Sequence, residues 1–161
     1  MAQPADNLND PEELSCVVIP APGESVLLPN VCVAEIVPWR RIKPLKGAPA
    51  WCMGVTGWRG QTIPVVHFAG FADANGTPPK AARCMVVMNR ARNASAPPFY
   101  ALAAEGLPRM LQLLEDDLKN DASDLGPAEV MRVAAGTEHA VIPDLAYIEA
   151  QVQELVQRLK G

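Results

Sequence analysis

The sequence predicts a mainly β fold with one helix at its C-terminal end. Hydrophobic residues make up 49% of the 161 residues and charged residues 20%, which is typical of a globular chain. The 16 prolines and 11 glycines divide the chain into short segments, and these suit strands joined by turns better than a helix bundle. The length allows one ordinary core, or two very small β subdomains that share one. We therefore expect a flexible N-terminal tail over residues 1–13 and a single domain over 14–161.

The first part of the chain predicts three strands and a loop. An apolar run at 14–19 ends in Pro20-Ala21-Pro22-Gly23, which is turn chemistry. Extended structure is expected again at 25–28 and at 31–37, and the basic, proline-containing stretch 38–49 is expected to be a loop.

Residues 51–58 and 61–68 are expected to pair as a hairpin around Arg59-Gly60, because Gly accepts a positive φ at the second central position of a tight turn. Pro64 lacks an amide donor, so we expect its strand to lie at a sheet edge or to carry a bulge there. Strand alternation places Trp51 and Trp58 on opposite faces. We expect Trp58 to be the exposed one.

The stretch 70–80 is expected to be a surface loop that separates two β halves, at approximately 14–70 and 80–143. The second half predicts strands at 82–88 and 99–105, and a short helix at 108–115 with Pro108 in its first turn. A polar and mobile stretch at 116–127 and a hairpin of 130–134 with 139–142 around Gly136 complete this half.

The last segment, 144–159, predicts a helix that begins at an Asp144 cap. Apolar residues recur on it every three or four positions, at Leu145, Ile148, Val152, Leu155 and Leu159. We expect this stripe to pack on the β structure. An intermolecular coiled coil is the alternative, and the repeat is short for it.

Composition argues against several classes of function. The net charge of −4 and the lack of a basic, aromatic-rich run disfavour nucleic acid, and no apolar segment has the length of a membrane span. With no leader-like start either, we expect a cytoplasmic chain without direct membrane insertion. The four cysteines lack a C-x-x-C pair, so buried free thiols are favoured over a disulfide framework.

No catalytic, metal or cofactor motif is present. The two histidines, His67 and His139, lie in predicted strands outside any nucleophile–base or metal pattern, and there is no phosphate-binding Gly-rich loop. We therefore expect no cofactor and no enzyme activity. A cysteine and a histidine that meet only in space would still allow a small thiol enzyme.

The segment 27–68 carries an ordered set of motifs: Glu35-Ile36 in a strand, a basic loop with prolines, Pro49 and Trp51, and then Gly54-Val55, Arg59-Gly60 and Ile63-Pro64-Val65. This set resembles the first half of the CheW family of chemotaxis coupling proteins, and the likeness extends more thinly over about 14–149. The opening Leu-Leu-Pro-Asn-Val and the Trp before Arg-Gly are most similar to the coupling proteins of type IV pilus chemosensory systems, such as PilI and ChpC.

The resemblance implies two five-stranded, SH3-like β-barrels that share an apolar seam. It also implies a non-catalytic adaptor that links a methyl-accepting chemoreceptor to the regulatory domain of a CheA-like histidine kinase. A structural β-barrel module of another assembly is the alternative. The chain departs from the family pattern at His67, where Asp is usual, and at Gly57-Trp58, where Asn-Leu is usual.

The partner-binding residues that the resemblance implies are Trp51, Gly54, Trp58, Arg59, Gly60 and Pro64. Arg59 suits such a contact because its planar fork can hold a carboxylate or carbonyl at two points. Without the resemblance, Arg59 is a solvated turn residue. Gly60 is explained more simply by turn geometry, and either tryptophan could be an interface anchor or a core residue.

Overall fold

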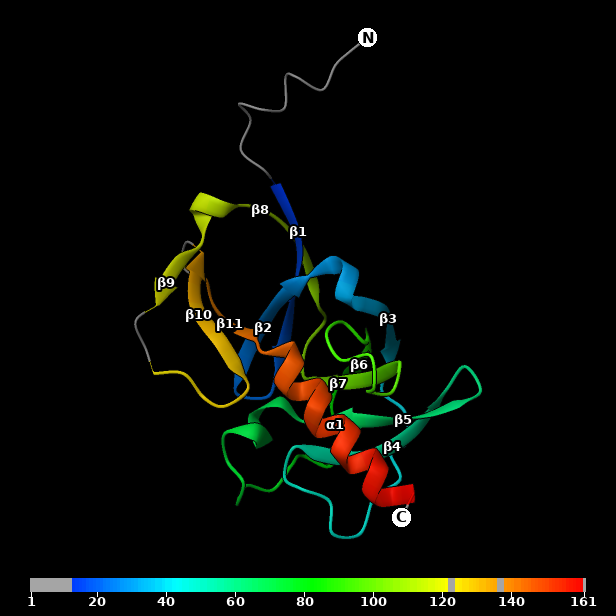
Figure 1. The fold of residues 1–161 in the computed structure, drawn as a ribbon. Coiled ribbons are helices and arrows are strands. Elements are labelled where there is room, and N and C mark those ends of the chain that lie inside the picture. Colours follow the sequence, from blue (N-terminus) through cyan, green and yellow to red (C-terminus); the bar gives the residue numbers. More distant parts are fainter. Residues whose placement is uncertain (1–12, 122–123, 136–137, 161) are drawn as a thin grey trace.

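The computed structural model describes residues 13–121, 124–135 and 138–160 and consists of two β-sheets and one C-terminal helix (Figure 1). In spatial order, sheet A contains β8 (Arg109–Leu114), β1 (Glu13–Ala21), β2 (Glu24–Pro29), β11 (Glu138–Pro143), β10 (Glu129–Ala135) and β9 (Lys119–Asp121). Sheet B contains β3 (Val33–Pro38), β6 (Cys84–Asn89), β7 (Phe99–Ala104), β5 (Gln61–Val66) and β4 (Cys52–Trp58). The helix is α1 (Leu145–Lys160). The predicted mainly β fold with a C-terminal helix is confirmed, and one sheet has six strands where five were expected.

The two sheets do not follow one another along the chain. Sheet B is formed by one continuous stretch, 33–104, whereas sheet A combines β1 and β2 with strands that follow that stretch. β1 pairs antiparallel with β8, and β2 pairs parallel with β11 at Val26 and Val141. The expected division into halves at approximately 14–70 and 80–143 is therefore wrong, because each sheet contains strands from both ranges. The loop at 70–80 lies within sheet B, between β5 and β6.

The helix expected at 108–115 is wrong, because β8 occupies this segment. β8 pairs with β1 in a regular register that sets Leu111 opposite Cys16 and Leu113 opposite Leu14. Leu111 and Leu113 pack against an apolar cluster inside sheet A, while Met110 is 56% exposed. This period of two is the strand pattern, and pairing with β1 outweighs the local helix signal at Pro108.

The expectation for Pro64 is also wrong. β5 lies between β4 and β7 and is not an edge strand, and the irregular register falls in β4 between Cys52 and Gly54. Pro64 is tolerated because the pairing of β5 with β7 covers only Val65 and Val66. The missing amide donor therefore lies outside that ladder.

Sheet B is covered on both faces. Alternate residues such as Val86 and Leu102 join the large cluster that also contains sheet A residues and α1, while Met85, Val87 and Ala101 form a second cluster on the other face. β6 therefore has no solvent-facing side, and its five residues from Cys84 to Met88 are all buried. A continuous run of buried apolar residues is typical of a central strand in a sheet that is packed on both faces.

α1 lies along the junction of the two sheets (Figure 1). Its first turn is capped as expected, with the backbone N–H of Tyr147 donating to Asp144 Oδ1 at 3.1 Å. Ile148, Val152 and Leu155 are buried in the large cluster, so the expected packing of the stripe is confirmed. Leu159 is 52% exposed.

The remaining expectations divide between confirmed and untested. The strands at 14–19, 25–28, 82–88 and 99–105 are confirmed, with β1 continuing through Pro20 to Ala21. The stretch 31–37 starts as a 3-10 helix (Asn30–Cys32) before β3, and β9 lies in the polar stretch 116–127. The hairpin of β10 with β11 is confirmed. Residues 1–12, 122–123 and Gly136 lie outside the described residues.

Candidate protein-interaction site

The hairpin of β4 and β5 ends in a two-residue turn at Arg59 and Gly60. Both residues have a positive φ, of 46° and 76°, and Trp58 pairs with Gln61 across the base of the turn. Positive φ at both central positions defines the turn whose twist matches the flanking strands. The tight hairpin is therefore confirmed, and Arg59 lies at its tip.

Arg59 is held in place by its neighbours. Glu35 of β3 accepts a hydrogen bond from Trp58 Nε1–H at 2.9 Å, and the same oxygen, Oε1, lies 3.2 Å from Arg59 Nη2. The guanidinium carbon of Arg59 lies 4.9 Å from the centroid of the Trp58 ring. The Arg59 side chain nevertheless remains 67% exposed. One carboxylate thus orients a cation that stays accessible to a partner.

Trp58 is only 4% exposed, so the expectation that it faces solvent is wrong. Its ring packs against Phe99 with the centroids 4.8 Å apart and belongs to the second core cluster of sheet B. Trp51 is 6% exposed, belongs to the large cluster and stacks on Phe71 at 5.1 Å. The two tryptophans lie on opposite sides as expected, but both are buried because sheet B is covered on both faces.

Gly54 is fixed by a close backbone approach. It has a φ of +137°, and a Cβ built there would lie 2.2 Å from the carbonyl oxygen of Lys43. Lys43 forms two backbone hydrogen bonds with Val55, at 2.8 and 2.9 Å. Gly54 therefore allows the basic loop to pair closely with β4 at an isolated antiparallel bridge between Lys43 and Val55. Pro64 is buried opposite Val55, so Arg59 and Gly60 are the exposed members of the six expected partner-binding residues.

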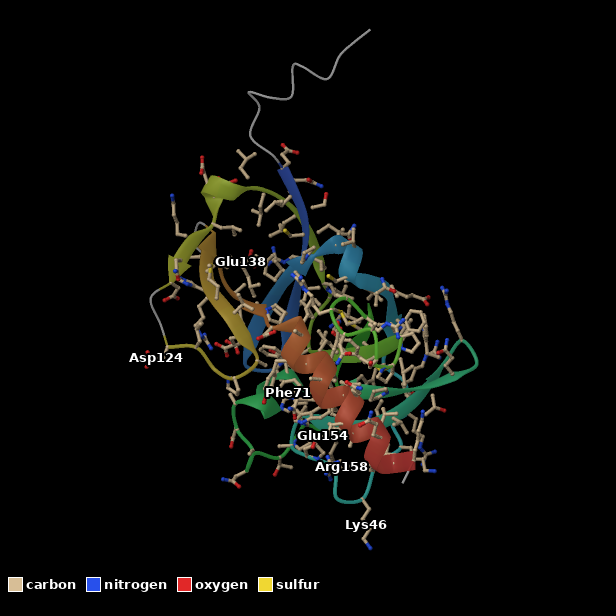
Figure 2. The ribbon with its side chains drawn as sticks, in the orientation of Figure 1. Lys46, Phe71, Asp124, Glu138, Glu154 and Arg158 are labelled. Atoms are coloured by element: carbon tan, nitrogen blue, oxygen red, sulfur yellow. The ribbon has the colours of Figure 1, made fainter. Side chains whose placement is uncertain are left out.

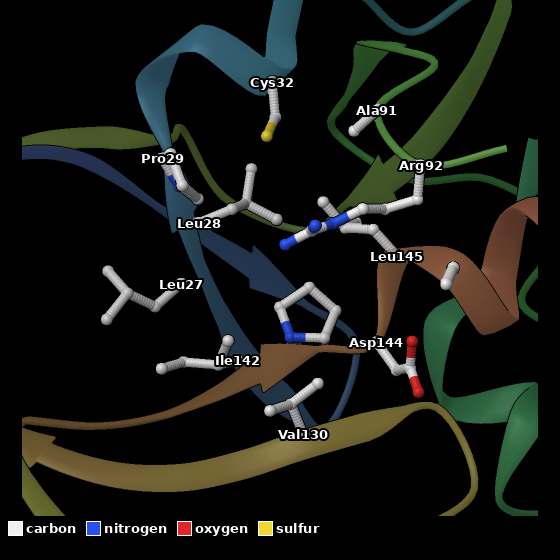
Figure 3. A pocket seen from close by; sticks show the side chains of 12 residues that line it. Leu27, Leu28, Pro29, Cys32, Ala91, Arg92, Val130, Ile142, Asp144 and Leu145 are labelled. Carbon is white, nitrogen blue, oxygen red and sulfur yellow. The ribbon is translucent and has the colours of Figure 1, made fainter. Parts of the chain in front are cut away.

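A second surface feature is an apolar groove between the sheets, with a volume of about 550 Å³ (Figure 3). Leu27, Leu28 and Pro29 line it from β2, Ala91 and Arg92 from the β6–β7 loop, and Val130 from β10. The end of β11 and the start of α1, residues 142–146, complete it. Arg92 extends across the groove, and Asp144 lies at its α1 end (Figure 3). These residues come from four separate stretches of the chain, so sequence reasoning missed them.

The β6–β7 loop, which contains Arg92, is held in position by a buried carboxylate. Glu149 of α1 is fully buried and accepts hydrogen bonds from the backbone N–H groups of Ala91, Arg92 and Asn93, each at 2.7 Å. Asn93 also donates from Nδ2 to Gln153 Oε1 at 2.8 Å. A buried carboxylate is stable here because backbone donors surround it. The helix thereby sets the position of the β6–β7 loop.

Burial shifts the pKa values of the four thiols and of one histidine. All four cysteines are free and buried, as expected, and burial raises the pKa of the thiol groups of Cys16, Cys32, Cys52 and Cys84. A raised thiol pKa leaves little thiolate at neutral pH. Burial lowers the pKa of His67, whose Nδ1 has no hydrogen-bond partner. Within the described part of the chain, no three His, Cys, Asp or Glu residues are placed to hold a metal ion.

The sequence model of the CheW-like domain matches residues 15–152 of the chain. The chain belongs to the CheW-like family. One solved structure with a similar fold is that of the scaffolding protein TtCheW from Thermoanaerobacter tengcongensis, with a TM-score of 0.62 at 14% identity. The likeness covers 82% of this chain and 89% of that one. No curated protein sequence matches the chain. Among the described residues, no helix is long and apolar enough to cross a membrane.

Proposed function

We propose that this CheW-like chain is a cytoplasmic, non-catalytic adaptor that couples chemoreceptors to a CheA-type histidine kinase. The observation that carries the proposal is the exposed guanidinium of Arg59, held by Glu35 and Trp58 at the tip of a rigid hairpin. Such a group can grip a carboxylate or carbonyl of a partner with little loss of side-chain freedom. No covalent step is needed, because the output is the placement of two partners.

The two surface features suit different partners. The hairpin presents a charged, oriented group and is assigned to the regulatory domain of the kinase. The groove is largely apolar and concave, with Arg92 extending across it and Asp144 at its α1 end, and is assigned to apolar side chains of a helical receptor tip. With both features on one rigid unit, binding of the receptor raises the local concentration of kinase.

We assign the pathway to type IV pilus control. Support comes from the sequence features shared with PilI-like and ChpC-like proteins, the Leu-Leu-Pro-Asn-Val run at 27–31 and Trp58 before Arg59. Trp58 contributes directly to the site, because its indole N–H and Arg59 bind the same oxygen of Glu35. Deletion of the gene is expected to impair surface motility and leave swimming intact.

The decisive experiment reconstitutes the adaptor with the host's CheA-type kinase and a chemoreceptor in vesicles. Kinase binding and receptor binding are measured separately for the parent and two variants. Arg59→Ala is expected to weaken kinase binding, and Ala146→Arg, which fills the groove from an exposed position, is expected to weaken receptor binding. Arg109→Ala in β8 is the matched control for loss of an exposed arginine.

Two results would contradict different parts of the proposal, the first the adaptor role and the second the assigned surfaces. One is a folded parent protein that binds neither partner at low salt. The other is a parent that binds both partners with affinities that Arg59→Ala and Ala146→Arg leave unchanged. The second result would retain the adaptor role and remove the assigned surfaces.

A further inference from the structure

Charge is unevenly divided between the two sheets. Residues 33–104, which form sheet B and its loops, contain nine of the 14 Lys and Arg residues and two of the 18 Asp and Glu residues. Glu35 is paired with Arg59, and Asp73 accepts a hydrogen bond from the backbone N–H of Asn75 within its own loop. An acidic protein therefore has one strongly basic half.

Two adjoining cavities form a trough on this basic half. Their volumes are about 350 and 340 Å³, and they share Pro44, Met53 and Pro78 in their walls. We call this surface the proline trough. One wall is the 42–50 loop, the other is the 74–80 loop, and Met53 of β4 lies between them. The other apolar wall residues are Ile42, Leu45, Ala48, Pro49, Ala50, Cys52, Ala74 and Pro79.

One cation, Lys80, lines the proline trough, and two further lysines belong to the 42–50 loop that forms one of its walls. Lys80 lines it, Lys43 lies between the wall residues Ile42 and Pro44, and Lys46 follows Leu45. All three side chains are exposed, and Figure 2 shows Lys46 pointing away from the body of the molecule. Arg59 forms an ion pair with Glu35. Among the described residues, no other Lys or Arg of the stretch 33–104 forms one. The lysines are therefore available to an outside anion.

We propose that the proline trough binds an extended, acidic segment of a partner protein that also carries apolar side chains. The apolar walls would take alternate side chains of the segment, and Lys43, Lys46 and Lys80 would pair with its carboxylates. Charge complementarity sets the sign of the partner's charge, because the described residues that line the two cavities include Lys80 and no Asp or Glu. The proposal goes beyond the adaptor role and does not depend on it.

Other anionic partners fit less well. The trough walls contain no aromatic ring on which a base could stack, as single-stranded nucleic acid binding requires. A membrane surface is bound by a projecting apolar face, whereas the apolar residues here line a concave surface. An extended peptide places side chains in a trough and charges at its margin.

The test uses a fluorescein-labelled synthetic peptide in which Glu and Leu alternate, with binding followed by fluorescence anisotropy at low salt. Two comparison peptides replace every Glu by Lys or every Leu by Ser. The parent is expected to bind the first peptide more tightly than either comparison peptide. The double variant Lys43→Glu/Lys80→Glu is expected to bind it about tenfold more weakly, since two attractive pairs become repulsive.

The matched control is Lys119→Glu, the same charge reversal in sheet A, which is expected to leave binding unchanged. The methyl NMR signal of Met53 is expected to shift on peptide addition, while the buried Met85 signal stays. The proposal is overturned if the parent does not bind the Glu-Leu peptide, or if the Glu-Ser peptide binds equally well. It is also overturned if Lys119→Glu weakens binding as much as the double variant, or if the protein binds only duplex DNA or phosphatidylserine vesicles.

Discussion

The side chains of Glu35 and Trp58 are joined by a hydrogen bond of 2.9 Å from the indole Nε1–H to Oε1 of the carboxylate. The same Oε1 forms an ion pair with Arg59, whose Nη2 lies 3.2 Å away. Because Trp58 is buried and Arg59 is exposed, Glu35 connects a core residue to the surface of the hairpin. Glu35 therefore contributes both to the core packing of Trp58 and to the orientation of Arg59, the residue proposed to bind a partner.

Glu35→Ala is expected to affect both properties. The buried indole N–H loses its acceptor, which is expected to lower the free energy of unfolding by about 1–3 kcal/mol. Arg59 loses its ion pair, so kinase binding is expected to weaken as well. Urea denaturation followed by tryptophan fluorescence measures the first effect. Glu105→Ala, a loss of an exposed carboxylate, is the control, and equal stability of the two variants would contradict the prediction.

Gly54→Ala and Gly60→Ala are expected to differ strongly. At Gly54 the new Cβ would lie 2.2 Å from the Lys43 carbonyl, so the basic loop must move, and a loss of several kcal/mol (about 2–4) is expected. At Gly60 the Cβ meets open space, and the cost is that of the positive φ, about 1 kcal/mol. Thermal unfolding of both variants measures the difference. Similar melting temperatures of the two variants would contradict the close approach of the Lys43 backbone to Gly54.

Glu149→Ala is expected to be among the most destabilising substitutions in α1. It leaves three backbone N–H groups of the β6–β7 loop without their acceptor, and a loss of about 3 kcal/mol or more is expected. Gln153→Ala removes one side-chain hydrogen bond to Asn93 and is expected to cost about 1 kcal/mol. Hydrogen exchange at Ala91, Arg92 and Asn93 reports the loop directly. Unchanged protection in Glu149→Ala would contradict the assigned role.

His67 is expected to make stability depend on pH. Burial lowers the pKa of the folded His67, so the unfolded chain binds more protons just below the usual histidine pKa of about 6.5. Stability is therefore fully present above that pKa and is lost as the pH falls toward the folded value. Urea midpoints measured from about pH 7.5 to 5 are expected to fall in the parent and to fall less in His67→Gln. Parallel profiles would refute this assignment.

The cysteines are expected to resist alkylation in the folded state. Burial covers all four thiols and raises the pKa of each, so iodoacetamide at neutral pH is expected to label the native protein slowly and the urea-unfolded protein fast. Mass spectrometry counts the labels. One fast-reacting cysteine in the native protein would favour a thiol enzyme over an adaptor.

Local patterns were sufficient to predict the elements that depend on neighbouring residues. The Arg59-Gly60 turn, the Asp144 cap and the apolar stripe of α1 each follow from residues a few positions apart, and each is confirmed. The segment 108–115 shows where this reasoning fails. Its strand structure depends on pairing with β1, which lies far away in the sequence.

The site was predicted less completely than the fold, for the same reason. Alternation correctly separated Trp51 from Trp58, but it could not reveal that sheet B is covered on both faces and buries both rings. Glu149 lies one residue after the apolar Ile148, and periodicity alone predicts an ordinary polar position there. Its three donors are supplied by a loop that precedes it by more than 50 residues.

The interleaved order of the two sheets also bears on how the chain reaches its native state during synthesis. Sheet B uses only the stretch 33–104, so all its strands have been made before β8 begins. β1 and β2 are neighbours in the sequence and pair with each other, whereas the outer partners of this hairpin, β8 and β11, are made only after sheet B. Loop-closure entropy makes such long-range pairing late and slow. A nascent chain halted before β8 would therefore contain all the strands of sheet B and an N-terminal hairpin whose two outer edges lack partners, and such edges are prone to aggregation.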